Sequence, residues 1–534
     1  MKKRVSRRSF IKALGLGVAS LAVGRSPMVL SALAVESEPI DVMIVGSGFG
    51  GSVAALRLAE QGIHTVLLER GKRWPVTQAQ DTFSTLQNPD GRSAWLSDVS
   101  LLGEPKPIEK FIGVLELVLG NGIAALTGAG VGGGSLVYAG VLYQPSQFLF
   151  NRAFGDRVDY QEMDSVYYPR VRSEIAPRPI PRKVLARPEY AAARKWWRLG
   201  HRTGLTTRFL DLGISWDAVW EELQGTRVPS VIAGEFWYGN NSGAKLSLDR
   251  NYLKHAERSG HLEIVTQQNV TAIEEGPDGR YVVMANEIDT NGSVLVQRKY
   301  VVKKLFLACG SLGTSKLLVR AKAQNGLLAL NDQVGQHWGN NGDFFGQLTG
   351  LNNRIKPNMG GTAPVAIEDH YNPIAPTAVE CYAEWALEGQ PGWIPSVGVS
   401  TPPAKGFFTY DFVADDVVLT WPGDDPEIAK IVEAGTATYM KIAEACGLPK
   451  HRVRKVKAGH CATTPVTASV TAHPLGGAVL DLATDNIGRV KNYQGLYVID
   501  GALVPGHTGC TNPALTITAL AERNIERILD RDFH

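Results

Sequence analysis

The sequence predicts an α/β fold with at least two core-forming units. Three observations lead to this prediction: a length of 534 residues, a strand–turn–helix–strand pattern over residues 40–69, and a buried strand that runs through a turn into a helix over residues 305–315. The composition, with 44% hydrophobic and 20% charged residues, is that of a globular protein and excludes a disordered chain. Five cysteines without C-x-x-C spacing indicate neither a disulfide framework nor a metal cluster.

The first segment, residues 1–34, indicates export from the cytoplasm. It carries seven basic and no acidic side chains, and residues 6–12 (SRRSFIK) resemble a twin-arginine export signal that ends at a small-residue cleavage site, residues 32–34. A basic amphipathic helix is the alternative. The whole chain has a formal charge of +3, but without this segment the charge is −4, so a nucleic-acid-binding body is not expected. We expect the protein to be periplasmic or secreted after export by the twin-arginine route.

The strand–turn–helix–strand pattern that follows is typical of dinucleotide binding. The run Ile40-Asp41-Val42-Met43-Ile44-Val45 is followed by the G-x-G-x-x-G turn GSGFGG at 46–51, an apolar helical pattern and a second strand that ends at Glu69. Gly46 allows the tight turn, Gly48 lets a pyrophosphate approach the backbone, and Gly51 permits close helix packing. Glu69 stands where a carboxylate accepts hydrogen bonds from a ribose. The unit by itself does not separate NAD from FAD.

Three further motifs extend this pattern along the chain. Residues 128–134 (GAGVGGG) place five glycines within seven positions, as suits backbone pressed against a flat ligand. Residues 305–315 (LFLACGSLGTS) form the buried strand, turn and helix, and residues 473–477 (HPLGG) precede YVIDG at 497–501 and TNP at 511–513. A flexible loop is the alternative for the glycine run, but the valine and leucine side chains beside it favour an ordered segment.

These stretches resemble the glucose–methanol–choline (GMC) family of FAD-dependent oxidoreductases, and within it the bacterial cholesterol oxidases that bind FAD non-covalently. The resemblance covers nearly all of the chain after the leader and is weakest at about 74–125 and 345–470. The stretches that carry it are VGGGSLV (131–137), YGNNSGAKLSLDRNYL (238–253), LFLACGSLGTSKLLVRA (305–321), HPLGGAVL (473–480), GRV (488–490), LYVIDGALVPG (496–506) and NPALTITALAERNIERI (512–528).

The resemblance implies two discontinuous domains. A Rossmann-like FAD-binding domain would comprise residues 38–72, 244–335 and 489–534, and a substrate-binding domain on a mixed or antiparallel sheet would comprise 73–243 and 336–488. The cofactor-binding residues that the resemblance implies are Gly46, Gly48, Phe49, Gly50, Gly51, Glu69, Gly134, Val270, Asp500 and Gly501. No histidine occurs at 127–134, where relatives with a covalent flavin generally attach it, so we expect non-covalent FAD.

His473 and Asn512 are the expected catalytic pair. Alcohol oxidation by a flavin requires removal of the hydroxyl proton, and a neutral imidazole suits this task because its ordinary pKa lies near the working pH. His473 lies in a turn that proline and glycine constrain, and Asn512 can direct its amide at the same oxygen. A lone histidine is more often structural, but both motifs match the family in order and spacing. His507 is interpreted as a loop residue.

The sterol enzymes also isomerise their product with a glutamate that follows a strand of the substrate domain and belongs to a Leu-Glu pair. Leu387-Glu388 is the nearest local match, so Glu388 is the expected base, although Glu380, Glu384 and Glu388 all read equally well as surface carboxylates. The chain departs from the sterol enzymes at three flavin-side positions, Tyr138, Val141 and Ala514.

The leading hypothesis is oxidation of a sterol-type 3β-hydroxyl to the ketone, with O₂ reduced to H₂O₂ and isomerisation from Δ5 to Δ4 as a second step. The alternative within the same chemistry is another bulky or aliphatic alcohol, with a quinone or other electron acceptor. A different class is an exported flavoprotein that binds lipid-like ligands without oxidising them. Nine apolar residues between Leu96 and Leu119 could form a lid that contacts membranes peripherally, and an ordinary core is the alternative for them.

Overall fold

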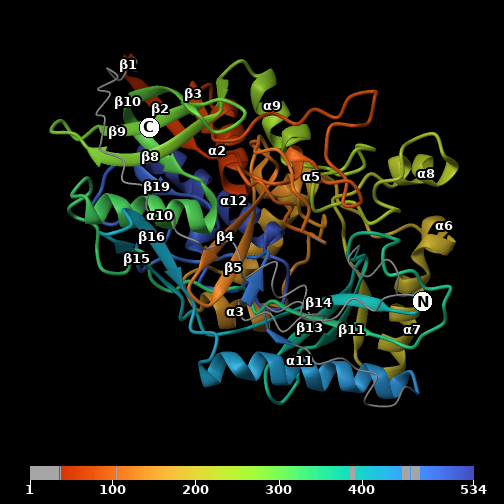
Figure 1. Ribbon diagram of the computed structural model, residues 1–534. Helices are drawn as coiled ribbons and strands as arrows, with labels where there is room; N and C mark the ends of the chain where they lie inside the picture. The colour runs from red at the N-terminus through yellow and green to blue at the C-terminus, as the bar shows by residue number, and fades with distance from the viewer. Residues whose placement is uncertain are drawn as a thin grey trace.

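The computed structural model describes residues 35–36, 38–103, 105–384, 391–447, 457–458 and 469–533. Two large sheets lie at opposite ends of the molecule, and a small three-stranded sheet lies between them (Figure 1). The export segment 1–34 and Glu388 lie outside the described residues. Within the described part, none of the helices combines the length and apolar character needed to cross a membrane.

The first large sheet has the mixed topology of a Rossmann-like unit. Its strand order is β7-β3-β2-β10-β9-β8, and β1 and β19 also pair with β10. The pairs from β7 through β10 are parallel, as is β10 with β19, whereas β10-β9-β8 is an antiparallel meander. The strands are β1 (Val35–Glu36), β2 (Ile40–Val45), β3 (Thr65–Glu69), β7 (Leu262–Thr266), β8 (Gln268–Glu275), β9 (Tyr281–Ile288), β10 (Val294–Leu307) and β19 (Leu496–Val498).

The central strands of this sheet are apolar because both of their faces are covered. Met43 and Ile44 of β2, and Leu305, Phe306 and Leu307 of β10, are completely buried. Strands β2, β3, β10 and β19 run in the same direction, so their carboxyl ends meet at one edge, which is where ligands bind in open α/β sheets. Strand β19, from near the end of the chain, pairs with one edge of β10, whose other edge pairs with β2 from the beginning of the chain.

Helices cover this sheet and are tied together by a buried ion pair. Helix α2 (Phe49–Glu60) packs against α12 (Ala514–Asp532) and α9 (Tyr252–Arg258). Arg57 of α2 donates to Glu522 of α12 at 2.7 Å, and Tyr252 of α9 donates to the same carboxylate at 2.8 Å. Removing one partner would leave a buried charge unpaired, so the network fixes how the three helices meet.

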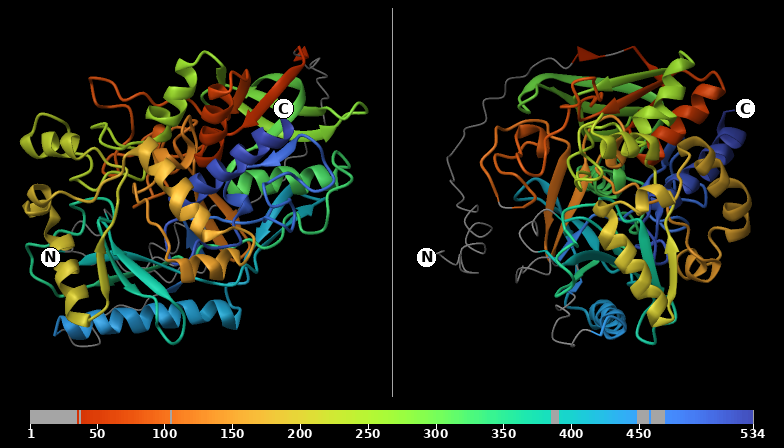
Figure 2. Two further views of the ribbon diagram at one scale, coloured as in Figure 1. Left: turned by 180° about the vertical axis from the view of Figure 1, so that it is seen from behind. Right: turned by 90° about the vertical axis from the view of Figure 1, so that its right-hand side faces the viewer.

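The second large sheet is antiparallel throughout, with strand order β17-β11-β14-β13-β12-β6. Helices α11 and α7 pack against it, and Figure 2 shows α11 along the outer side of the molecule, far from the C-terminus. This sheet and the Rossmann-like sheet confirm the predicted fold class. Its elements are β6 (Thr206–Phe209), β11 (Phe344–Leu348), β12 (Val365–Asp369), β13 (Thr377–Cys381), β14 (Ile394–Ser400), β17 (Lys457–Ala458), α7 (Ala191–Thr203) and α11 (Pro426–Ala445).

The small sheet joins the two units. Hairpin β4 (Leu115–Gly120) and β5 (Ile123–Gly128) pairs with β18 (Ser469–Thr471), which leads directly into the HPLGG motif. Of the nine apolar residues considered for a lid, Ile112 and Leu115 are buried, Leu119 is 73% exposed, and the other six are partly exposed. The remaining elements are α3 (Gln147–Phe154), α4 (Tyr160–Glu162), α5 (Tyr168–Ile175), α6 (Arg182–Leu185), α8 (Trp216–Gln224), α10 (Gly310–Ala323), β15 (Phe407–Asp411) and β16 (Asp416–Thr420).

Candidate active site

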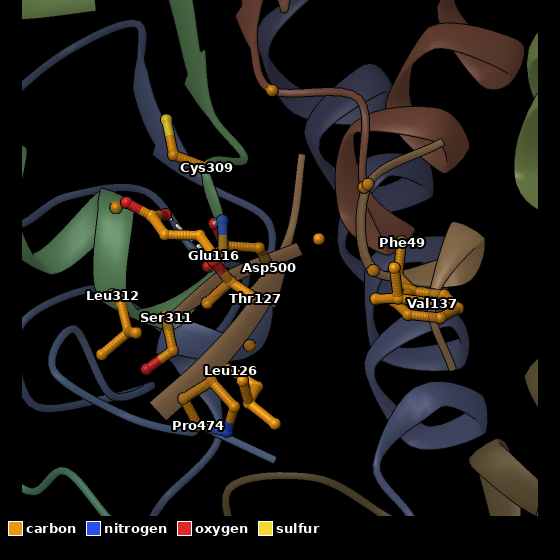
Figure 3. Close-up of a pocket in the computed structure, with 18 of the residues that line it drawn as sticks. Phe49, Glu116, Leu126, Thr127, Val137, Cys309, Ser311, Leu312, Pro474 and Asp500 are labelled. Carbon is orange, nitrogen blue, oxygen red and sulfur yellow. Dashed lines mark hydrogen bonds between the residues drawn. The ribbon is translucent and has the colours of Figure 1, made fainter. Parts of the chain in front are cut away.

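A cavity of about 640 Å³ is lined by residues from both large sheets and from the β4–β5 hairpin. At one end its walls are the glycine turn after β2 and the residues that follow β3, β10 and β19. At the other end its walls include Asp343, Glu380, His473 and Asn512. Figure 3 shows part of this cavity, with Phe49 and Val137 on one side and Asp500, Glu116 and Ser311 on the other.

The glycine turn is shaped for close contact with a ligand. A Cβ on Gly50 would lie 1.7 Å from the carbonyl oxygen of Ile499, so the start of α2 packs directly on the end of β19. A Cβ on Gly48, by contrast, would meet nothing within 4 Å, and Gly48 lines the cavity. Helix α2 has no side-chain cap and no acidic residue in its first turn. Its free N–H groups thus suit a phosphate.

The predicted cofactor residues separate into lining and supporting positions. Gly46, Phe49, Gly134, Val270 and Gly501 line the cavity. Of the whole predicted set, Gly51 does not line it; a Cβ on Gly51 would lie 2.0 Å from the carbonyl oxygen of Gly46, so Gly51 supports the turn from below.

Glu69 lines the cavity but its carboxylate is already well supplied with donors. Oε2 accepts from the Ser47 hydroxyl at 2.5 Å, and Oε1 accepts from the Gly71 amide at 2.9 Å and the Gly130 amide at 3.3 Å. The side chain therefore joins the two glycine loops to each other. It stands beside the expected ribose position and also organises the loops that form that position.

Asp500 plays a similar organising role at the end of β19. Its carboxylate accepts from the Gly310 amide at 2.8 Å, from the Thr314 hydroxyl at 2.6 Å and from the Ala502 amide at 2.8 Å. Burial raises the pKa of Asp500 to about 6, although these three hydrogen bonds lower it. Asp500 thus fixes the start of α10 and the amide of Ala502, next to Gly501 at the edge of the cavity.

Sequence reasoning missed an ion pair in the wall of the cavity. Arg70, directly after Glu69, lies 2.5 Å from the Glu116 carboxylate of β4, which also accepts from Thr127 of β5 at 3.2 Å. The guanidinium stacks over Trp95, 4.8 Å from the ring centroid. Burial opposes both charges, but their attraction outweighs it, so the pKa of Arg70 is raised and that of Glu116 is lowered.

At the opposite end, His473 forms a tight pair with Asp343. The ring nitrogen Nδ1 lies 2.7 Å from Asp343 Oδ1, and Nε2 has no hydrogen-bond partner among the described residues. Burial by itself lowers the pKa of His473, but the Asp343 carboxylate outweighs burial, so the pKa stands above its ordinary value. Asp343 immediately precedes β11, and its side chain is 1% exposed.

Asn512 and Glu380 form the other half of this group. Asn512 Nδ2 donates to Glu380 Oε2 at 3.4 Å, and Asn512 Oδ1 and Glu380 Oε1 are both buried with no hydrogen-bond partner among the described residues. Buried polar atoms are nearly always satisfied, so two unpaired oxygens on cavity residues indicate that a ligand supplies their partners. Burial raises the pKa of Glu380 to about 8, although His473 and the Asn512 hydrogen bond lower it.

The interpretation of Glu380 as a surface carboxylate is therefore wrong, because Glu380 is 1% exposed on β13 and lines the cavity. A sequence signal was present: Glu380 is the single charged residue in the apolar strand Thr-Ala-Val-Glu-Cys. Asp343 had a weaker signal, the polar run Asn340-Asn341 that precedes it across Gly342. His507, interpreted as a loop residue, is buried, and burial lowers its pKa to about 4.

The cavity, with the α2 N-terminus at one end and His473 at the other, fits a long ligand. Its pyrophosphate would lie at the α2 end and its reactive group at the His473 end. The cavity leaves open space at Gly48, and near Gly134 a Cβ would meet only Phe49 at 3.6 Å. A nucleotide site that continues to a partly buried imidazole, a buried amide and a buried carboxyl group is typical of a cofactor-dependent oxidoreductase.

Comparison with known proteins identifies the family. Residues 204–337 and 413–521 match the two models described as GMC oxidoreductase, and residues 44–75 match an NAD(P)-binding Rossmann-like domain. A cholesterol oxidase of Acinetobacter baumannii is 24% identical, over 93% of this chain and 95% of that protein. A cholesterol oxidase of Mycobacterium tuberculosis is also 24% identical, over 90% of each chain. The chain is thus an FAD-dependent oxidoreductase of the GMC family that resembles cholesterol oxidases.

Solved structures share the fold at low identity. Pyridoxine 4-oxidase from "Mesorbium loti" has a TM-score of 0.63 at 14% identity, covering 92% of this chain and 99% of that one. A fungal aryl-alcohol oxidase has a TM-score of 0.61 at 12% identity, covering 93% of this chain and all of that one.

Proposed function

We propose that this protein oxidises the 3β-hydroxyl of a sterol-like alcohol to a ketone and passes the electrons to O₂, which yields H₂O₂. The observation that carries the proposal is the buried group His473, Asn512 and Glu380 at the end of a cavity that begins at a dinucleotide-binding turn. The similarity to two cholesterol oxidases supports the sterol as substrate.

His473 and Asn512 have distinct tasks in this reaction. Nε2 of His473 accepts the hydroxyl proton, because Nδ1 is engaged by Asp343. Asn512 Nδ2, which uses one N–H on Glu380, directs its other N–H at the substrate oxygen and holds the hydroxyl near His473. FAD, when bound, supplies the acceptor for the hydride from the carbinol carbon.

Glu380 is our proposed base for isomerisation, in place of Glu388. Its unpaired Oε1 belongs to a residue of the cavity wall next to Asn512. Glu380 can therefore act on the same bound steroid that His473 and Asn512 oxidise. As a carboxylate it takes a proton from C4 of the Δ5-ketone and returns it to C6, so the double bond moves into conjugation without net loss of protons.

The residues present support non-covalent FAD. The loop between β5 and Gly134 contains no histidine, and the contacts available to the cofactor are backbone amides, the α2 N-terminus and glycine surfaces.

We also propose export by the twin-arginine route, to the periplasm or the medium. Apolar side chains such as the exposed Leu119 would then contact membranes peripherally. Lysine substitution of Arg7 and Arg8 with cell fractionation tests the export.

A second candidate is oxidation of a different bulky or aliphatic alcohol with a quinone or other acceptor. Tyr138, Val141 and Ala514, the three departures from the sterol enzymes, all line the cavity. Tyr138 contacts Phe49 edge-on, with ring centroids 5.7 Å apart, so this wall of the cavity is aromatic. A flavoprotein that merely binds lipids is less well supported, because binding alone needs neither the His473–Asp343 pair nor the buried Glu380.

The test is an anaerobic visible spectrum of the purified protein before and after cholesterol, followed by air. Bleaching by cholesterol and recovery in air with release of peroxide would support the sterol oxidase. Bleaching by other alcohols alone, or no recovery in air, would favour the second candidate. A colourless protein that cannot be reconstituted with FAD would contradict both.

A further inference from the structure

Both carboxylate oxygens of Asp343 accept hydrogen bonds from the segment that carries His473. Oδ1 receives the His473 ring, whereas Oδ2 accepts from the Thr471 hydroxyl at 2.7 Å and from the Ala472 amide at 3.1 Å. Thr471 in turn accepts from the His473 amide at 2.9 Å. The turn that presents the imidazole is therefore fixed at three successive residues by one buried side chain.

The hydrogen bond from the His473 ring to Asp343 Oδ1 determines which ring nitrogen carries the proton. A carboxylate only accepts hydrogen bonds, so the contact at 2.7 Å requires a proton on Nδ1. In the neutral imidazole, Nε2 then carries the lone pair. The charged or titratable groups that act on the ring are Asp343, from the segment before β11, and Glu380, from β13.

We infer that Asp343 is the positioning residue of this active site: it holds His473 in the tautomer whose Nε2 accepts the hydroxyl proton, and it stabilises the imidazolium that results. The inference rests on the proposed alcohol oxidation. In that step the O–H bond breaks and an N–H bond forms at Nε2, the electron pair of the broken C–H bond leaves with the hydride, and Asp343 stays ionised throughout. Asp343 touches neither reacting atom.

Asp343→Asn is the sharpest variant because the structure dictates how the amide must sit. The oxygen that faces Thr471 and Ala472 receives two donors, so the Asn carbonyl must occupy that position. The NH₂ group is then directed at His473 Nδ1 and forces the proton onto Nε2, the wrong tautomer. An Asp-to-Asn change that imposes a wrong tautomer in a serine protease lowers kcat by about 10⁴, and we expect a fall of about 10²–10⁴ here.

The expected signature differs from that of a structural defect. In Asp343→Asn, kcat falls while KM and bound FAD are retained, and the acid limb of the pH–rate profile moves to lower pH because the negative charge beside the ring is gone. Asp369→Asn is the matched control. Asp369 is another buried aspartate, at the end of β12, which binds Thr438 and Lys441 away from the cavity, so turnover should be unchanged.

Combination with His473→Gln separates this inference from the proposed function. If Asp343 acts through the ring, Asp343→Asn lowers turnover no further in the His473→Gln background. A further fall there, or normal turnover in Asp343→Asn alone, would overturn the inference and leave His473 as base. Normal turnover in His473→Gln would overturn the proposed base and the inference together. Nitrogen NMR of ring-labelled wild-type protein, which depends on neither variant folding, should show the proton on Nδ1; a proton on Nε2 would refute the assignment.

Discussion

The burial of Glu380 makes isomerisation strongly dependent on pH. Its carboxyl pKa is raised from 4.5 to about 8, chiefly by burial, so the protonated form dominates at neutral pH. The ionised share is about 1% at pH 6, about 10% at pH 7 and about 90% at pH 9 when the pKa is about 8. Because only the carboxylate can take the C4 proton, the isomerisation rate should rise about tenfold per pH unit below pH 8 and level off near pH 9.

A Δ5-3-ketosteroid added directly to the holoenzyme isolates this step from oxidation. The conjugated enone product absorbs in the ultraviolet, so initial rates are followed from pH 6 to pH 9. Glu380→Gln should abolish the pH-dependent rate, with a loss of at least about 10²-fold at pH 9. Glu384→Gln and Glu388→Gln are the matched controls, because both glutamates follow Glu380 closely in the sequence. Both variants should keep the wild-type profile.

A flat profile from pH 6 to pH 9, as a carboxyl pKa of 4.5 would give, would refute the role of a buried Glu380 with a raised pKa. Full isomerisation in Glu380→Gln combined with its loss in Glu388→Gln would return the role to Glu388.

Three other predictions concern the cofactor and the base. His473→Asn should keep its flavin while alcohol turnover falls by about 10²–10⁴, measured by flavin content and peroxide release; normal turnover would remove His473 from the mechanism. Gly48→Ala should fold normally and bind FAD more weakly, because its Cβ points into the open cavity. Gly50→Ala should unfold more easily, because its Cβ would lie 1.7 Å from the carbonyl oxygen of Ile499. Flavin titration and urea unfolding compare the two variants, and equal stabilities would contradict this difference. Acid precipitation should release the flavin into the supernatant, and yellow colour that stays in the pellet would indicate a covalent bond.

The parts of the site that the sequence predicted are the parts encoded locally. The turn from Gly46 to Gly51 needs only neighbouring residues to be recognisable, and His473 stands inside its own short motif. The discontinuous domains came from the family resemblance and not from any pattern in the residues. Parallel strands from distant segments leave no local trace of their pairing.

The missed residues depend on contacts between remote segments. Asp343 meets His473 across 130 positions, and Glu380 meets Asn512 across 132. Choosing among Glu380, Glu384 and Glu388 required knowing which one lies on the buried strand. The local Leu-Glu match favoured Glu388, but burial of β13 selects Glu380 for the cavity.

The placement of β19 has a consequence for biosynthesis. The glycine turn expected to bind the pyrophosphate is made within the first tenth of the chain, yet Gly50 packs on Ile499 and β10 pairs with β19. A ribosome-bound chain that has not yet emerged beyond residue 499 therefore lacks one wall of the cofactor cavity. The cavity can therefore be completed only after nearly the whole chain has been synthesised, so FAD meets its full binding site late.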